Sequence, residues 1–297
     1  MSPNARVALV GLGNMGCPMA TNLVRAGHEL VGHDAAPYAR DAARAAGVQV
    51  VDDPADVVAP VVILMLPNSD VVERVLLEGG LADRISGGLV IDMSSSDPLR
   101  TRDLATELAA RGVRLVDAPV SGGVKGAVAG TLTIMAGGAQ ADLDEAEPFL
   151  AALGSTTRTG DVGSGHALKA LNNLLSGVSL LASSEAIQAG RRFGLSDEVM
   201  LQVLNTSSGR SFSTEFKWPT FILPETYDSG FSLRLLLKDM RIATTLARQV
   251  GLPAGAGECA VEHWDAAATL LPETADHTEI ARYADTPHPT TDAARRD

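Results

Sequence analysis

Short apolar runs alternate with helical patterns along the first half of the chain. Strand-like runs occur at 6–10, 29–32, 48–51, 61–66, 89–92, 113–117 and 131–136, and helix-like spacing lies between them, for example at 37–46, 69–77, 98–111 and 141–152. A run as apolar as 61–66 is typical of a parallel strand that is buried on both faces. The alternation predicts an α/β fold with a doubly wound, Rossmann-like parallel sheet.

The pattern changes near residue 163. Gly163-Ser164-Gly165 predicts a flexible start, followed by helical spacing for about 30 residues and further helices at 196–205, 232–250 and 253–270. We therefore expect an α/β domain over 1–162 and an all-helical domain over 163–297. The Thr-, Pro-, Asp- and Arg-rich segment 284–297 is predicted to be a mobile tail.

A glycine-rich segment, Gly11-Leu12-Gly13-Asn14-Met15-Gly16, follows the first strand and precedes a helix. Its spacing fits G-x-G-x-x-G: Gly11 permits a tight turn, Gly13 lets the backbone approach a pyrophosphate, and Gly16 lets the helix pack against the strand. Glycine triplets also occur in ordinary loops, but this context favours dinucleotide binding. The first domain is thus interpreted as the dinucleotide-binding domain.

Asp34 ends the second strand about 20 residues past the glycines, where an acid binds the adenosine ribose hydroxyls. Its carboxylate would repel a 2′-phosphate, and Ala35 supplies no compensating positive charge. The expected cofactor is therefore NAD.

Composition narrows the partners. The formal charge is −12 and the pI is near 4.9, which argues against a nucleic-acid or anionic-membrane surface. The chain contains no apolar stretch of membrane-spanning length, no signal-like N-terminus, and only two cysteines, which suggest neither a disulfide framework nor a metal site. We expect a cytoplasmic protein without a metal. Only four of the 24 basic residues are lysine: Lys125, Lys169, Lys217 and Lys238.

Lys169 and Asn173 are four residues apart on the long predicted helix and share one face. A snorkelling lysine beside an ordinary amide is the structural interpretation. The catalytic interpretation is that Lys169 exchanges a proton with the oxygen of a carbonyl that gains or loses hydride, while Asn173 holds that oxygen. His166, three residues earlier, is interpreted as polar surface at the helix start rather than as a catalytic base.

Polar segments also follow two of the strands. Ser121-Gly122-Gly123 offers backbone N–H groups and a hydroxyl to a carboxylate, or is simply a glycine-rich turn. Ser94-Ser95-Ser96-Asp97 contacts the nicotinamide ribose or amide, caps the next helix, or does both with different residues.

Lys238 and Asp239 lie in the predicted helical domain. Either Lys238 closes over the nicotinamide while Asp239 adjusts the charge state of a lysine, or the two form an exposed ion pair.

The chain to about residue 283 resembles the β-hydroxyacid dehydrogenase family, in its 3-hydroxyisobutyrate dehydrogenase-like branch. Four ordered motifs carry the resemblance: Gly11–Gly16 with Asn22-Leu23, Asp117–Gly123 continuing into Gly130–Met135, Gly163–Asn173, and Lys238-Asp239. One departure is Ser94-Ser95, where the family often has Ser-Thr; a hydroxyl is kept.

The resemblance implies a role for each matching residue. Lys169 would be the catalytic lysine and Asn173 its substrate-binding partner, with Ser121, Gly122 and Gly123 on the substrate carboxylate. Leu66, Pro67 and Ser95 would line the cofactor cleft, and Lys238, with Phe231 nearby, would close on the cofactor. The family also implies a homodimer or homotetramer assembled through the helical domain.

These observations predict an NAD-dependent oxidoreductase that interconverts a small 3-hydroxy acid and its semialdehyde, with 3-hydroxyisobutyrate as the first guess. A reductase of tartronate semialdehyde, glyoxylate or succinic semialdehyde is the alternative, because one or two side chains separate such substrates. A non-catalytic NAD-binding protein would need neither Lys169 nor Asn173, and imine reductases typically lack the lysine. The particular substrate and the physiological direction stay open.

Overall fold

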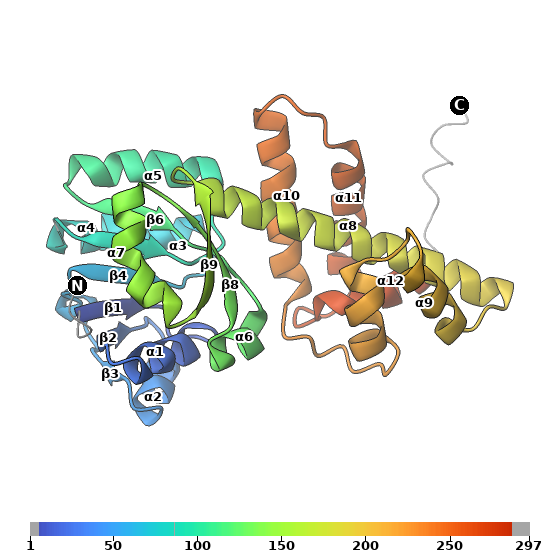
Figure 1. The fold of residues 1–297 in the computed structure, drawn as a ribbon, viewed down its shortest axis with the longest axis horizontal. Helices are drawn as coiled ribbons and strands as arrows, with labels where there is room; N and C mark the ends of the chain where they lie inside the picture. The colour runs from blue at the N-terminus through green and yellow to red at the C-terminus, as the bar shows by residue number, and fades with distance from the viewer. Residues whose placement is uncertain (1–5, 86, 287–297) are drawn as a thin grey trace. The chain divides into compact units, whose positions relative to one another are not determined.

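The computed structural model describes residues 6–85 and 87–286 (Figure 1). Its contacts divide the chain into two compact units between Ala170 and Leu171. That division falls inside the long helix α8 (Ser164–Phe193), a few residues after the change of pattern at 163. Most of the tail predicted over 284–297 lies outside the described residues.

The first unit is built on a nine-stranded sheet in the order β3-β2-β1-β4-β5-β6-β8-β7, with β9 paired to β8. The strands from β3 to β6 are parallel, as predicted, whereas β8 runs antiparallel to β6 and β7. The strands are β1 (Arg6–Val10), β2 (Glu29–His33), β3 (Gln49–Val50), β4 (Val61–Leu64), β5 (Leu89–Asp92), β6 (Arg114–Asp117), β7 (Val120–Ser121), β8 (Leu132–Gly137) and β9 (Gly154–Gly160).

Helices cover both faces of this sheet (Figure 1). Alternate residues of β1 explain why: Val7 and Leu9 join one buried cluster, while Ala8 and Val10 join the other. The first cluster includes α1 (Gly16–Arg25), α2 (Pro37–Ala45) and α7 (Gln140–Ala151), and the second includes α3 (Ser69–Glu73), the π-helix η2 (Arg74–Glu78), α4 (Leu81–Arg84) and α5 (Pro98–Ala110). The doubly wound arrangement is confirmed. The 3₁₀ helix η1 (Pro54–Asp56) and helix α6 (Gly123–Ala129) complete the unit.

The second unit, from Leu171 onward, is helical throughout its described elements. Besides most of α8 it contains α9 (Asp197–Thr206), the π-helix η3 (Ser213–Ile222), α10 (Leu233–Gln249), α11 (Gly255–Leu270), the 3₁₀ helix η4 (His277–Glu279) and α12 (Ile280–Asp285). Trp218 and Trp264 are fully buried in its core. Gly177 lets α8 approach α10 closely, because a Cβ there would lie 2.3 Å from Met240 Sδ. None of the described helices combines the length and apolar character that a membrane crossing needs.

One lysine is buried in this second core. Lys217 lies on η3 and is only 6% exposed, with its Nζ donating to Ser176 Oγ at 2.8 Å. Burial lowers the pKa of Lys217 to about 8, and the negative charge of Asp276 only partly opposes this effect. The ammonium form is therefore less stable in the folded chain than in the unfolded one.

This asymmetry predicts a pH-dependent stability difference between the native chain and Lys217→Met. Between the folded pKa of about 8 and the ordinary value of 10.5, the unfolded chain binds the proton and the folded chain does not, so stability rises with pH. The native chain should gain about 2 kcal/mol relative to Lys217→Met between pH 8 and pH 10. Thermal unfolding of both proteins across this range measures the difference; parallel Tm curves would contradict the assignment.

Candidate active site

The glycine-rich loop lies where the strand order reverses. Strand β1 has β2 on one side and β4 on the other, so the loop after β1 opens at the switch point of the sheet. Gly11 has a φ of +101°, and a Cβ there would lie 2.2 Å from the carbonyl oxygen of Met65. A Cβ on Gly16 would lie 1.8 Å from the carbonyl oxygen of Gly11. Both glycines are required by close backbone packing, as the spacing predicted.

Gly13 differs, because a Cβ there would have no heavy atom within 4 Å. Gly13 and Asn14 are exposed, and the first turn of α1 contains no acidic residue and no capping side chain. A helix N-terminus without its own anion is suited to a phosphate group. The loop therefore fits a dinucleotide on steric and electrostatic grounds.

Asp34 lies directly against this loop. Its Oδ2 accepts a hydrogen bond from the backbone N–H of Leu12 at 2.7 Å, and its Oδ1 accepts one from Ala36 at 2.8 Å. The glycine-rich loop and Asp34, both predicted to bind the cofactor, are thus in direct contact. The two backbone N–H groups fix the orientation of the Asp34 carboxylate.

Arg40 is a neighbour that the sequence analysis missed. Its Nη1 donates to the carbonyl oxygens of Asp34 at 2.6 Å and Ala35 at 3.0 Å, and its Nε pairs with Asp52 at 2.9 Å. The positive charge that Ala35 does not supply is therefore present on α2, but it is engaged by Asp52. In the sequence, only the position of Arg40, six residues after Asp34 in a predicted helix, indicated that it could reach this site.

The loops after β4 and β5 are joined by one hydrogen bond, from the backbone N–H of Leu66 to Ser94 Oγ at 2.9 Å. Ser94 is buried, whereas Ser95 is half-buried and Pro67 is exposed. Asp97 caps α5, accepting from the N–H groups of residues 99 and 100. Ser94 thus joins these two loops, and Ser95, the next residue, is only half-buried.

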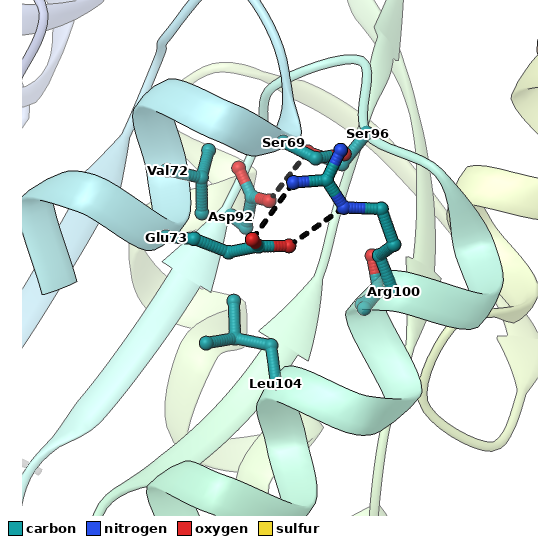
Figure 2. Close-up of a pocket in the computed structure, with 8 residues that line it drawn as sticks. Ser69, Val72, Glu73, Asp92, Ser96, Arg100 and Leu104 are labelled. Carbon is teal, nitrogen blue, oxygen red and sulfur yellow. Dashed lines mark hydrogen bonds and ion pairs between the residues drawn. The ribbon is translucent and has the colours of Figure 1, made fainter. Parts of the chain in front are cut away.

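A crevice beside these serines is structural as well. Figure 2 shows Arg100 reaching across it to Glu73, with hydrogen bonds of 2.9 and 2.7 Å. Ser69, Asp92 and Ser96 also line it, and Ser96 Oγ donates to Asp92 at 3.0 Å. The crevice has no room for a water molecule. We assign it no ligand.

Lys169 and Ser121 lie together in the first unit. Lys169 Nζ donates to Ser121 Oγ at 2.9 Å, so residues 48 positions apart in the sequence share one polar site. Ser121 ends β7, and Gly122 and Gly123 follow with φ angles of +121° and +59° and exposed backbone. The two predicted groups, the lysine and the Ser-Gly-Gly segment, are brought together. Lys125, one turn into α6, is exposed.

The start of α8 is rigid, contrary to the flexible start expected from Gly163-Ser164-Gly165. Asp117, the last residue of β6, accepts from the N–H groups of Gly163 at 2.6 Å and His166 at 2.8 Å. A Cβ on Gly165 would lie 2.2 Å from the carbonyl oxygen of Met135, so this glycine permits tight packing on the sheet. The prediction of surface polarity for His166 is also wrong, because the residue is 1% exposed.

In the second unit, Asn173 is fixed by an acid. Its Nδ2 donates to Asp239 Oδ2 at 2.7 Å, and Lys238 Nζ forms an ion pair with Asp239 Oδ1 at 3.0 Å. Asp239 is 2% exposed, so the view of Lys238-Asp239 as an exposed surface pair is wrong for the acid. The helical spacing could have predicted the burial of Asp239, because Asp239 falls on the same face of the helix as Leu236 and Ala243, which are both buried.

Phe231 is held at the start of α10 by a polar cluster. Its backbone N–H donates to Asp276 Oδ2 at 3.3 Å, and its ring lies 5.6 Å from that of His277. Burial favours a high pKa for the Asp276 carboxyl, but hydrogen bonds from His277, Thr278 and Ser229 outweigh it and hold the pKa well below its ordinary range. In the described part of the chain, no three His, Cys, Asp or Glu side chains are grouped as metal ligands would be.

A glycine loop at the switch point of the sheet, an acid after β2 and a lysine on α8 are the features expected of a nicotinamide-dependent dehydrogenase. Two family models match this chain. Residues 6–163 match the NAD-binding domain of 6-phosphogluconate dehydrogenase, and residues 163–284 match the NAD-binding domain of NADP-dependent 3-hydroxyisobutyrate dehydrogenase. The chain belongs to the 3-hydroxyisobutyrate dehydrogenase-like family of NAD(P)-dependent hydroxyacid dehydrogenases.

Relatives of several kinds support this assignment. The chain is 37% identical to 2-(hydroxymethyl)glutarate dehydrogenase of Eubacterium barkeri, over 85% of this chain and 86% of the relative. It is 38% identical to 3-hydroxyisobutyrate dehydrogenase of Pseudomonas aeruginosa, over 84% and 88%. The solved 3-hydroxyisobutyrate dehydrogenase of Mycobacterium tuberculosis with L-serine superposes with a TM-score of 0.89 at 33% identity, covering 95% of this chain and all of that one.

More distant structures share the fold alone. An imine reductase from Myxococcus stipitatus in complex with NAD⁺ superposes with a TM-score of 0.65 at 16% identity. Fold similarity at this level does not assign a reaction. The reaction has to be argued from the site.

Proposed function

We propose that this enzyme interconverts a small 3-hydroxy acid and its semialdehyde with NAD, and that 3-hydroxyisobutyrate is the first substrate to test. The observation that carries the proposal is the 2.9 Å contact between Lys169 Nζ and Ser121 Oγ. It places a proton-transfer group beside the segment proposed to hold a carboxylate. Bound NAD would supply the hydride acceptor.

Lys169 is proposed to move the proton. In the oxidation direction its neutral amine takes the hydroxyl proton as hydride leaves the carbon that bears this hydroxyl. In reduction its ammonium returns a proton to the carbonyl oxygen. Asn173 lies one turn further along α8, on the same face, and is proposed to hold the same oxygen. One N–H of its amide is engaged by Asp239, which leaves a second N–H for the substrate.

The substrate carboxylate is assigned to Ser121, Gly122 and Gly123. The hydroxyl of Ser121 and the exposed backbone of the two glycines supply donors, and the ammonium form of Lys169 adds a positive charge next to them. This arrangement favours a carboxylate a short distance from the reacting hydroxyl. A compact 3-hydroxy acid meets that requirement.

NAD is assigned to residues at the end of β1, β2, β4 and β5, with two more from the second unit. The steric openness at Gly13 and the fixed carboxylate of Asp34 support the first group. The proposed cofactor-binding residues are Gly11, Leu12, Gly13, Asn14, Met15, Gly16, Asp34, Leu66, Pro67, Ser95, Phe231 and Lys238.

A panel of substrates tests this proposal. 3-Hydroxyisobutyrate, 2-(hydroxymethyl)glutarate and the reduced forms of tartronate semialdehyde, glyoxylate and succinic semialdehyde are assayed with NAD by following the absorbance of the reduced nicotinamide. At least one 3-hydroxy acid should be oxidised.

Lys169→Ala should lower the kcat for that substrate by about 10²–10⁴-fold with NAD affinity kept, because the hydroxyl proton no longer has an acceptor. A panel without turnover, or a Lys169→Ala variant with native turnover, would refute the assignment.

The fixed carboxylate of Asp34 predicts a preference for NAD. A 2′-phosphate would lie near this negative charge, and the opposing charge of Arg40 is engaged by Asp52. The kcat/KM with NAD should exceed that with NADP by about tenfold or more, equivalent to about 1.4 kcal/mol. Asp34→Asn should reduce this ratio of kcat/KM with NAD to kcat/KM with NADP, mainly by raising the kcat/KM with NADP. A native enzyme that prefers NADP would overturn this reading of Asp34.

We further propose that the chain forms a homodimer or homotetramer through its helical unit. Leu171, Leu175, Ala182, Ala186 and Phe193 are all exposed on α8 at spacings of four and seven residues, which places them along one stripe. Leu175 is 72% and Phe193 86% exposed, and an apolar stripe of this kind is typical of an interaction surface.

A cytoplasmic location is also proposed, since Cys17 and Cys259 are free thiols.

Light scattering tests the oligomer. The native chain should have two or four times the mass of the 30.8 kDa protomer. Leu175→Glu should raise the dissociation constant by about tenfold or more, because it buries a charge in the interface. Leu252→Glu is the matched control, since Leu252 is 60% exposed but lies outside α8. Equal masses for the two variants would exclude this stripe as the contact.

A further inference from the structure

The first turn of α8 contains a buried histidine that no step of the proposed reaction uses. His166 is surrounded by Asp117 at the end of β6, Thr101 on α5 and Ser94 after β5, all of them buried. Its backbone N–H is one of the two groups that Asp117 binds. The ring is therefore part of the anchor of the helix that carries Lys169.

Both ring nitrogens of His166 are engaged. Nε2 lies 3.1 Å from the carbonyl oxygen of Ser94, and Nδ1 lies 2.9 Å from Thr101 Oγ1. A carbonyl oxygen only accepts, so Nε2 carries a proton and donates it to Ser94. Asp92 and Asp117 face the ring at 3.7 and 3.8 Å. The imidazole thus connects α8, α5 and the loop after β5 through directed contacts.

The contact with Ser94 leads to the proposed cofactor site. Ser94 Oγ accepts from the backbone N–H of Leu66, and Ser95 is the next residue. On the other side of the ring, Lys169 follows His166 by three residues on α8. A single side chain therefore joins the loops assigned to the nicotinamide side of the cofactor to the helical turn that bears the proton-transfer group.

We propose that His166 is a positioning residue: it fixes the distance between Lys169 and the cofactor-binding loops through its bonds to Ser94 and Thr101, without touching the substrate. The inference rests on the proposed function, since it takes Lys169 as the proton-transfer group. Hydride transfer at the carbinol carbon and proton transfer at its oxygen require both partners within a narrow range of distance, and a misplacement of about 1 Å costs roughly 100-fold in rate. A histidine that merely filled the core would affect stability and leave the rate at saturation unchanged.

Two amide variants separate these roles. The glutamine of His166→Gln carries an amide N–H that can replace the Nε2 donor to the Ser94 carbonyl, whereas the asparagine of His166→Asn is one methylene shorter and loses that bond. His166→Asn should lower kcat by about 10–100-fold, with the KM for substrate and the Kd for NAD within about threefold of native. His166→Gln should recover most of that kcat. Both are assayed well below their Tm values, with circular dichroism confirming the fold.

A crystal structure of His166→Asn provides a readout independent of turnover: Lys169 Nζ should be displaced from Ser121 Oγ. Native kcat in His166→Asn, an equal loss in both variants, or an undisplaced Lys169 would overturn the positioning role. Failure of the proposed function looks different, because the native enzyme would then turn over no hydroxy acid, while the displacement of Lys169 could still be measured. If His166→Asn does not fold, it is replaced by Thr101→Val, which removes the Nδ1 partner together with the bond from the same hydroxyl to the carbonyl oxygen of Asp97. A loss of kcat is again expected, and native kcat would overturn the proposal.

Discussion

The placement of Lys169 depends on one buried carboxylate. Asp117 binds two N–H groups of the first turn of α8 with its two oxygens, and so anchors that helix at the carboxyl end of β6. Burial raises the pKa of Asp117, while His166 and the two backbone N–H groups oppose the shift. The two backbone N–H groups that anchor the helix therefore also compensate part of the charge of this carboxylate, together with the His166 ring at 3.8 Å.

Close backbone packing makes this anchor precise. Gly165 and Gly137 both lie where a Cβ would collide with the neighbouring element, at 2.2 Å from Met135 and 2.6 Å from Ser164 respectively. The first turn of α8 consequently packs closely on β8. Ser121, on the neighbouring strand β7, lies within hydrogen-bond distance of Lys169. A glycine pattern that suggests flexibility in a sequence here marks a tightly packed stretch of backbone.

Features that depend on local pattern were predictable, and features that depend on distant contacts were not. The glycine loop, Asp34 and the pair Lys169 and Asn173 follow from spacing alone. Strand β9 escaped prediction because Gly154–Gly160 contains no apolar residue, and α6 did so because its glycines resemble a turn. The burial of His166 likewise depends on Thr101 and Ser94, which lie 65 and 72 residues away.

Asp239 shows what a buried acid adds to a neighbouring amide. A carboxylate oxygen only accepts, so its contact with Asn173 must involve the NH₂ group, and the amide cannot flip without losing a charge-assisted hydrogen bond. Asn172 donates to Asn173 Oδ1 at 3.2 Å and favours the same orientation. The direction of the Asn173 amide is therefore set before any substrate binds. Since Lys238 pairs with the other carboxylate oxygen, its charge is linked to that same amide through Asp239. Two residues that the family motifs present separately thus act through one buried carboxylate.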